Sequence, residues 1–167
     1  MVNEIKYRRS VRKYKDKIIP EEDILEIIHA SCMAPSALNQ QPWAFKIVSD
    51  KETKDLVAKS FLTTHFAKNA SHVILFLMDK RHFRIEGMAP LDVSSAVTLA
   101  LLEAQSKGIG SCWCGVYPSK GRMKKCREIF KVEESRYIPF AIVTFGYPEK
   151  EDAFYEADRD YKGKILK

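Results

Sequence analysis

The sequence has 167 residues, 46% hydrophobic and 30% charged, which is typical of a globular chain with one hydrophobic core. No apolar run approaches the ~20 residues of a membrane span, and no apolar stretch opens the chain, so we expect a cytosolic, single-domain protein over residues 1–167 without membrane contact. The net charge is +6, and residues 1–17 carry seven Lys and Arg against Glu4 and Asp16, a local +5. Such a local excess indicates a site. It disfavours a nucleic-acid-binding protein, which would spread its basic residues over a groove-sized face.

The first helix is expected between Pro20 and Pro35. A proline and two glutamates are typical of a helix start, apolar residues follow at helical spacing, and a second proline ends the pattern. The segment "WAFKIVS" (43–49) follows as a strand. Residues 52–67 indicate one or two weakly amphipathic helices, and the apolar run "SHVILFLM" (71–78) predicts a strand buried on both faces.

The second half of the chain continues this alternation. Residues 79–90 are expected to form a charged loop. The segment "DVSSAVTLALLEAQSK" (92–107) predicts a helix that is apolar or small nearly all round, so we place it centrally, and packing between two subunits would explain its composition. A third strand "SCWCGVY", a short basic helix "SKGRMKKCREIF", a fourth strand "YIPFAIVTFGY" and a charged arm follow. The alternation predicts a layered α/β or α+β domain.

The four cysteines are expected to be buried thiols without a metal. They are too few for a disulfide scaffold in a chain of this size. We expect the C-x-C pair, Cys112 and Cys114, to point its thiols to opposite faces of a strand, which argues against joint metal ligation. No His or Cys partners stand at a zinc-like spacing elsewhere.

Three polar segments are candidates for a site. The first, "RRSVRKY", groups Arg8, Arg9, Ser10 and Arg12, whose donors suit the oxygens of one phosphate; a solvated basic turn or a patch for an acidic surface is the alternative. The second, "APSALNQQPW", offers amides that suit a planar heterocycle, or it is an ordinary connection between a helix and a strand.

The third segment is "GIGSCWCGVYPS". Its Gly115 indicates a bulge or the close approach of another group, unless it serves packing alone. Neither a G-x-G-x-x-G motif nor a Walker pattern occurs, and the four histidines make no recognisable pair with a nucleophile. The segments thus offer contacts for a phosphate and a heterocycle, and no hydrolytic machinery.

Four collinear segments, "RRSVRKY", "APSALNQQPW", "NASHVILF" and "GIGSCWCGVYP", resemble the successive signatures of the nitroreductase family over roughly residues 4–148. The resemblance implies an α+β three-layer sandwich with a mainly antiparallel central sheet flanked by helices. It also implies a homodimer with FMN at the interface.

The resemblance assigns the following residues to FMN. Arg8, Arg9, Ser10 and Arg12 would hold the phosphate and ribityl chain; Pro35, Ser36 and Asn39, with Gln41, would reach the ring from the partner subunit; Cys114, Gly115 and Val116 would lie beside the flavin, and Pro90, Leu91 and Asp92 near the ring. Two departures stand out. The cation that many members place near flavin N1 could only be Lys68 or His65 here, and the cation that closes the phosphate site is assigned to Arg159.

The resemblance therefore predicts an FMN-dependent oxidoreductase. It would pass hydride from NADH or NADPH through flavin N5 to a nitroaromatic, quinone or flavin acceptor by a ping-pong mechanism, with the chemistry carried by FMN and no catalytic side chain or metal. A flavin-binding protein without turnover is the first alternative and a basic nucleic-acid module the second. The acceptor pocket is expected along residues 59–66 and 80–90.

Overall fold

The computed structural model describes residues 1–157, 159 and 162–165. Within these residues the chain forms a four-stranded sheet in the order β1-β2-β4-β3, in which all neighbouring strands are antiparallel. The strands are β1 (Trp43–Val48), β2 (His72–Asp79), β3 (Gly110–Gly115) and β4 (Tyr137–Gly146). The four strands lie where the sequence predicts them, and the mainly antiparallel sheet is confirmed.

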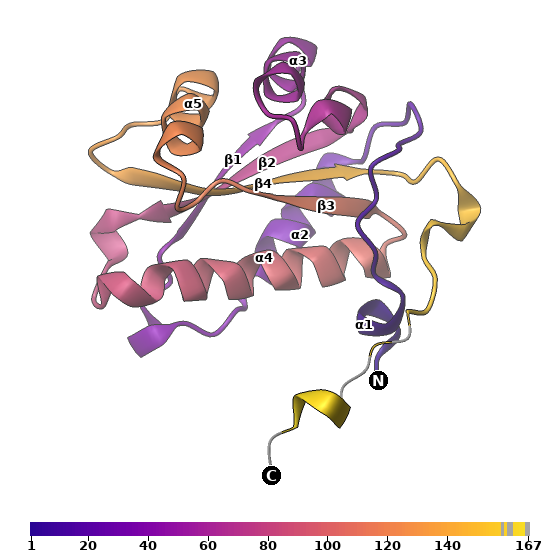
Figure 1. Cartoon of the computed structure of the whole chain (residues 1–167), viewed down its shortest axis with the longest axis horizontal. Helices are drawn as coiled ribbons and strands as arrows, with labels where there is room; N and C mark the ends of the chain where they lie inside the picture. The colour runs from indigo at the N-terminus through magenta and orange to yellow at the C-terminus, as the bar shows by residue number, and fades with distance from the viewer. Residues whose placement is uncertain (158, 160–161, 166–167) are drawn as a thin grey trace.

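Helices cover both faces of the sheet (Figure 1). One face carries α3 (Lys51–Ser60) and α5 (Lys120–Phe130), and the other carries α2 (Glu21–Cys32) and α4 (Ala89–Ser106). The short helix α1 (Asn3–Tyr7) lies near the end of α4, and the 3-10 helices η1 (Ala37–Asn39) and η2 (His65–Asn69) follow α2 and α3. The expected α+β fold with flanking helices is therefore confirmed. No helix among the described residues is long and apolar enough to cross a membrane.

The two central strands form the middle of the core. All eight residues of β2 are buried, as the continuous apolar run predicts. Their side chains alternate between two hydrophobic clusters, with Ile74 and Phe76 on the side of α2 and α4 and Val73 and Leu75 on the side of α3 and α5. Each helix layer thus packs on its own face of one sheet.

Helix α4 differs from its prediction. It begins at Ala89, three residues earlier than expected, with Pro90 in its first turn, where a missing N–H costs nothing. One face, including Val93 and Val97, is fully buried, but Leu91 on the opposite face is 59% exposed. Within one chain α4 therefore lies on the outside of the sheet rather than at the centre, because no further layer of the described chain covers the small and apolar residues of its outer face.

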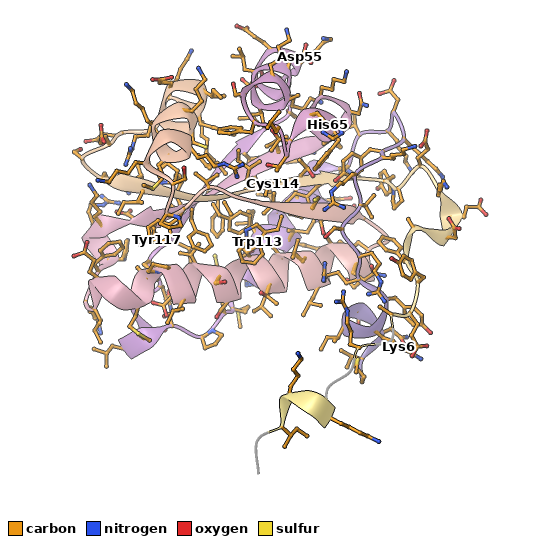
Figure 2. The ribbon with its side chains drawn as sticks, viewed as in Figure 1. Lys6, Asp55, His65, Trp113, Cys114 and Tyr117 are labelled. Atoms are coloured by element: carbon orange, nitrogen blue, oxygen red, sulfur yellow. The ribbon has the colours of Figure 1, made fainter. Side chains whose placement is uncertain are left out.

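The prediction for the C-x-C pair is wrong. Cys112 and Cys114 belong to the same buried cluster, beneath α3 and α5, whereas Trp113 between them packs against the opposite cluster. Figure 2 shows Cys114 on the α3 side of the sheet and Trp113 on the α4 side. The physical reason is the period of a strand, which is two, so residues two apart share a face. Among the described residues, no group of three or more potential ligands could hold a metal ion.

Residues 10–14 lie against the open edge of the sheet at β3. Ser10 forms a parallel bridge with Ser111, and the Val11 N–H donates to the Ser111 carbonyl at 2.9 Å. A Cβ atom at Gly110 would meet the Val11 side chain at 2.8 Å, and one at Gly146 would meet the Tyr14 ring at 2.7 Å. These two glycines let the segment dock closely, so its position is set by the sheet.

Candidate functional site

A basic cavity of about 560 Å³ lies where residues 9–13 meet residues 150–159. We call it the arginine pocket; its lining includes Arg9, Ser10, Arg12 and Arg159, together with Lys13, Lys150 and one acidic residue, Asp152. The structure thus brings together four of the residues that the sequence points to, from the two ends of the chain. Arg8 is half-buried at the end of α1 and is not part of this lining.

Arg9 is held rigidly at the wall of the arginine pocket. Its guanidinium donates to the backbone carbonyls of Lys6, at 3.0 Å, and Arg8, and it lies 4.7 Å from the centre of the Tyr155 ring. Its Nε–H is buried and has no partner among the described residues. The segment that carries Tyr155 is tied to α1 by the ion pair of Lys6 with Glu156, at 2.9 Å (Figure 2 labels Lys6). A cation held in place at the wall of the cavity suits a phosphate oxygen.

Arg12 connects the arginine pocket to the thiols of β3. Its guanidinium is 6.0 Å from the centre of the Phe66 ring. A hydrogen bond from Cys114 lowers the pKa of Cys112, and the nearby charge of Arg12 and the Ser10 hydroxyl act in the same direction. The pKa of Cys114 is raised by its hydrogen bond with Cys112 and by burial. Two residues that line the arginine pocket, Ser10 and Arg12, therefore also act on the thiol face of β3.

The end of β3 offers open space beside this face. A Cβ atom at Gly115 would have no neighbour within 4 Å. The register with β4 is regular up to Gly115, where β3 ends, and directly after it the N–H groups of Val116 and Tyr117 both donate to the Phe140 carbonyl, an irregularity of the kind that a bulge makes. The Gly115 carbonyl accepts from Arg122 at 2.6 Å, and the next residue, Val116, is buried. Close approach of another group to Gly115 thus stays a prediction that the geometry permits.

The loop 35–41 is built to present its tip. Leu38, Asn39 and Gln41 adopt positive φ angles of 50°, 52° and 45°. The Ser36 hydroxyl accepts from the Gln41 N–H at 3.0 Å, and the Gln41 amide donates to the Asn39 side chain at 2.8 Å. The side chains of Asn39 and Gln41 are exposed, and Pro35 is exposed as well.

Two buried polar residues support the loop from behind. Asp92 accepts from the Ala37 N–H at 2.9 Å and from the Gln40 side-chain amide. The side-chain oxygen of Gln40, Oε1, in turn accepts from the backbone N–H groups of Arg84, at 2.8 Å, and Ile85, at 3.0 Å. The sequence pointed to Asp92 only through the resemblance, and it grouped Gln40 with the amides that could contact a heterocycle, whereas the buried Gln40 amide is bonded within the chain. The sequence gives little sign of this supporting role of Gln40, since its partners Arg84 and Asp92 lie 44 and 52 residues away.

Within one chain the loop and the arginine pocket do not meet. Asp92 fixes the loop at the start of α4, whereas Ser10 pairs with Ser111, shortly after the end of that helix (Figure 1). The helix has 18 residues, and at 1.5 Å per residue it separates the two places by about 27 Å. One ligand could contact both groups only if they came from two chains.

The two candidates for a cation near a flavin ring lie elsewhere. Lys68 lines a different cavity, and the His65 ring packs edge-on against Phe66 at 5.3 Å with its Nδ1 near the Leu62 carbonyl. Figure 2 shows His65 on the α3 side of the sheet, and it is not among the residues that line the arginine pocket. The charges that act on the thiols of β3 are instead those of Arg12 and Arg122. Of the predicted C-terminal arm, residues 158, 160, 161, 166 and 167 lie outside the described residues.

Comparison with known proteins gives consistent relatives over most of the chain. The family described as nitroreductase matches residues 5–89 and 61–147. A protein of Archaeoglobus fulgidus, named as a candidate NADH dehydrogenase/NAD(P)H nitroreductase, is 41% identical over 152 residues, covering 90% of this chain and 87% of that protein.

Solved structures agree with this similarity. A candidate NADH oxidase from Clostridium acetobutylicum superposes with a TM-score of 0.92 at 33% identity, covering 98% of this chain and 97% of that one. An FMN-dependent nitroreductase from Clostridium difficile R20291 gives a TM-score of 0.86 at 32% identity, covering 99% and 98%. The similarity extends over the β3 thiol face, the loop 35–41 and the arginine pocket.

Proposed function

Because the chain belongs to the nitroreductase family, we propose that it is an FMN-dependent oxidoreductase that uses NADH or NADPH. The observation that carries the proposal is the arginine pocket, a cationic cavity whose Ser10 pairs with Ser111 near the start of β3, while the same strand ends in open space at Gly115. A phosphate at one end and a flat ring at the other match the two ends of FMN. Bound FMN would supply hydride acceptance and donation at N5, and the protein would bind, orient and tune it.

The residues present fit the phosphate of FMN. Arg9 offers a guanidinium held in place by two backbone carbonyls, Ser10 a hydroxyl, and Arg12 and Arg159 further charge, while Asp152 is the one acidic residue in the lining. Hydrogen bonds between cations and phosphate are short and strong compared with neutral ones. Cys114, Gly115 and Val116 would then lie along the flavin, with two positive charges, Arg12 and Arg122, acting on this segment.

We infer that the working molecule is a homodimer with the flavin between subunits. The loop 35–41 presents Asn39 and Gln41 to solvent on a rigid frame, about 27 Å along α4 from the arginine pocket of the same chain. A second copy would bring its own loop to the pocket. It would also cover the outer face of α4, where Leu91 is exposed.

The acceptor is inferred to be a small nitroaromatic, quinone or flavin that uses the same open side of the ring as the nicotinamide. Reduced nicotinamide and acceptor then cannot be bound together, so we expect ping-pong kinetics with parallel double-reciprocal lines. Residues 59–66 and 80–90 would shape the acceptor pocket. The proposal needs no side-chain acid or base, because protons can come from solvent.

Flavin titration of purified protein tests the proposal. We expect one FMN per chain, and bleaching of the flavin by NADH or NADPH without oxygen, reversed by a quinone. Arg12→Ala should weaken FMN by about tenfold or more, since a charged hydrogen bond contributes about 1.5–3 kcal/mol, yet change riboflavin affinity little. Lys124→Ala, an exposed cation on α5, is the matched control.

Two results would count against the proposal in different ways. Equal losses for FMN and riboflavin in Arg12→Ala would mean that the arginine pocket does not hold the phosphate. A flavin that binds firmly but is reduced by neither nicotinamide would favour the flavin-binding protein without turnover. A flavin-loaded 19 kDa monomer in light scattering would remove the interface site.

A further inference from the structure

A second basic cavity lies beyond the arginine pocket on the same N-terminal segment. It has a volume of about 360 Å³ and is lined by residues 14–18, Lys54 and residues 68–71; we call it the lysine pocket. It shares no lining residue with the arginine pocket. In Figure 1 the segment 14–18 passes beside the turn that follows α3, which forms the other wall.

The charges around the lysine pocket are unbalanced. Lys15, Lys17, Lys54 and Lys68 line it against one carboxylate, Asp16. None of these five groups takes part in an ion pair with any described residue. Lysines elsewhere in the chain do find partners: Lys51, on the same helix as Lys54, pairs with Asp55 at 2.6 Å.

Lys54 is the unusual member of the group. The residue is only 9% exposed, whereas lysines are almost never so buried without an anionic partner. Its ammonium donates to the carbonyls of Ala70, at 2.8 Å, and Ser71, at 3.5 Å. These carbonyls satisfy donors but leave the positive charge unneutralised, and an unpaired buried charge is costly.

The charge of Lys54 acts on its surroundings. The pKa of His72 is lowered by burial, and then by the positive charge of Lys54. His72 in turn pairs through Nδ1 with the Ser71 hydroxyl at 2.9 Å, and that hydroxyl accepts from the Ile19 N–H. A polar network therefore lies behind the lining residues Lys54 and Ser71, and no carboxylate of the described chain forms an ion pair with Lys54.

Helix capping explains only part of the arrangement. Lys54 stabilises the carbonyl end of η2, which is a common role for a lysine. That role requires neither Lys15 nor Lys68 at the rim, nor Lys17, whose ammonium lies over the Tyr147 ring at 4.3 Å. The exposed Asn69 adds an amide donor.

We propose that the lysine pocket binds a multiply charged phosphate-bearing anion that is separate from the flavin. Ammonium groups act as point charges for phosphate oxygens, and those of Lys15, Lys54 and Lys68 around one cavity favour a dianion or trianion over a single carboxylate. The volume exceeds the needs of one phosphate group, so a diphosphate, free or as part of a nucleotide, is the class of ligand that it fits.

Calorimetric titration with pyrophosphate tests the proposal, using protein saturated with FMN at 0.15 M salt so that weak surface attraction is screened. We expect one site per chain. Lys15→Gln/Lys68→Gln, which alters only exposed side chains, should weaken binding by at least about tenfold. Lys54→Met should abolish binding, with folding checked by circular dichroism.

Lys59→Gln is the matched control for Lys54, because it removes one positive charge from the same helix, α3, at an exposed position outside the pocket. It should leave the affinity within about twofold. No binding by the unaltered protein at millimolar pyrophosphate, or equal losses in Lys59→Gln and the double variant, would overturn the proposal.

Two further arms identify the site and the source. Arg12→Ala should keep the pyrophosphate affinity of the unaltered protein. If Arg12→Ala instead lost that affinity while the lysine variants kept it, the anion would bind in the arginine pocket and the proposal would be overturned. This arm does not depend on flavin turnover, so it stays informative if the proposed oxidoreductase function fails. ADP that binds about tenfold more tightly than pyrophosphate would point to a nucleotide as the source; equal affinities would point to the free anion.

Discussion

The Tyr14 hydroxyl joins the N-terminal segment to the sheet, so its removal should cost far more stability than one oxygen atom suggests. The side chain is 8% exposed, and its oxygen lies 2.6 Å from the Val11 carbonyl and 2.7 Å from the Thr144 hydroxyl. A phenol has one proton. It must donate to the carbonyl, and the Thr144 hydroxyl therefore donates to the phenol oxygen. Burial raises the pKa of Tyr14 far above its usual range, so the group stays a donor.

Tyr14→Phe should lower the free energy of unfolding by about 2–4 kcal/mol. The substitution leaves two buried groups, the Val11 carbonyl and the Thr144 hydroxyl, without this partner, and each such group costs about 1–3 kcal/mol. Thr144→Val removes only one of the two bonds and should cost about 1 kcal/mol. In the double variant the Thr144 hydroxyl is no longer stranded, so the two losses should not add.

The unaltered protein, the two single variants and the double variant form a double-mutant cycle, and urea denaturation followed by circular dichroism measures the stability of all four. Equal m-values would show that their denatured states are comparable. We expect a coupling of about 1 kcal/mol or more. Tyr137→Phe is the control: this tyrosine is half-buried, its hydroxyl has no hydrogen bond among the described residues, and the change should stay within about 0.5 kcal/mol. Additivity of the Tyr14 and Thr144 losses to within about 0.5 kcal/mol would refute the shared-proton argument.

Two further substitutions probe the neighbouring structure. Gly110→Ala should destabilise the protein by about 1–3 kcal/mol and weaken FMN binding, because its Cβ would lie 2.8 Å from Val11. Gly121→Ala, in open space on α5, is the control and should be neutral or stabilising. Equal changes in the unfolding free energies of the two variants, measured by calorimetry, would contradict the clash. The pKa of His72 is below its usual 6.5 because of burial and Lys54, so folded His72 binds fewer protons than unfolded His72. Stability should therefore fall as pH drops below about 6.5, and His72→Gln should reduce that slope in urea titrations at pH 7.5 and 5.5; an unchanged slope would exclude His72 as its source.

The elements of the fold were predictable because their signals are local. The apolar run of β2, the prolines around α2 and the glycine that follows α4 each act within a few residues. It was harder to predict which face of each helix or strand is buried. The C-x-C error came from applying the strand period wrongly, and the outer face of α4 looked like core because small residues are compatible with both environments.

The segments that form the candidate site were predictable, but the buried hydrogen bonds that hold those segments in place were not. The resemblance named Arg9, Ser10, Arg12 and Arg159, which the structure gathers in one cavity. The contact of Gln40 with Asp92 joins residues 52 apart, and no local pattern announces it. The lysine pocket escaped notice for the same reason. The sequence shows scattered lysines, and only the fold places Lys54 opposite the segment 14–18.

The packing of residues 10–14 ties the stability of the protein to its proposed chemistry. Val11 and Tyr14 are buried against Gly110 and Gly146, and this leaves Arg12 exposed toward the arginine pocket. The cation is therefore positioned by apolar contacts and one phenol, before any ligand binds. A ligand gains affinity when its site is held in place in advance. Tyr14→Phe, which touches no lining residue of that pocket other than Val11, should therefore weaken FMN as well as the fold. Riboflavin, which lacks the phosphate, should lose less. Equal losses would mean that the segment positions the ring rather than the phosphate.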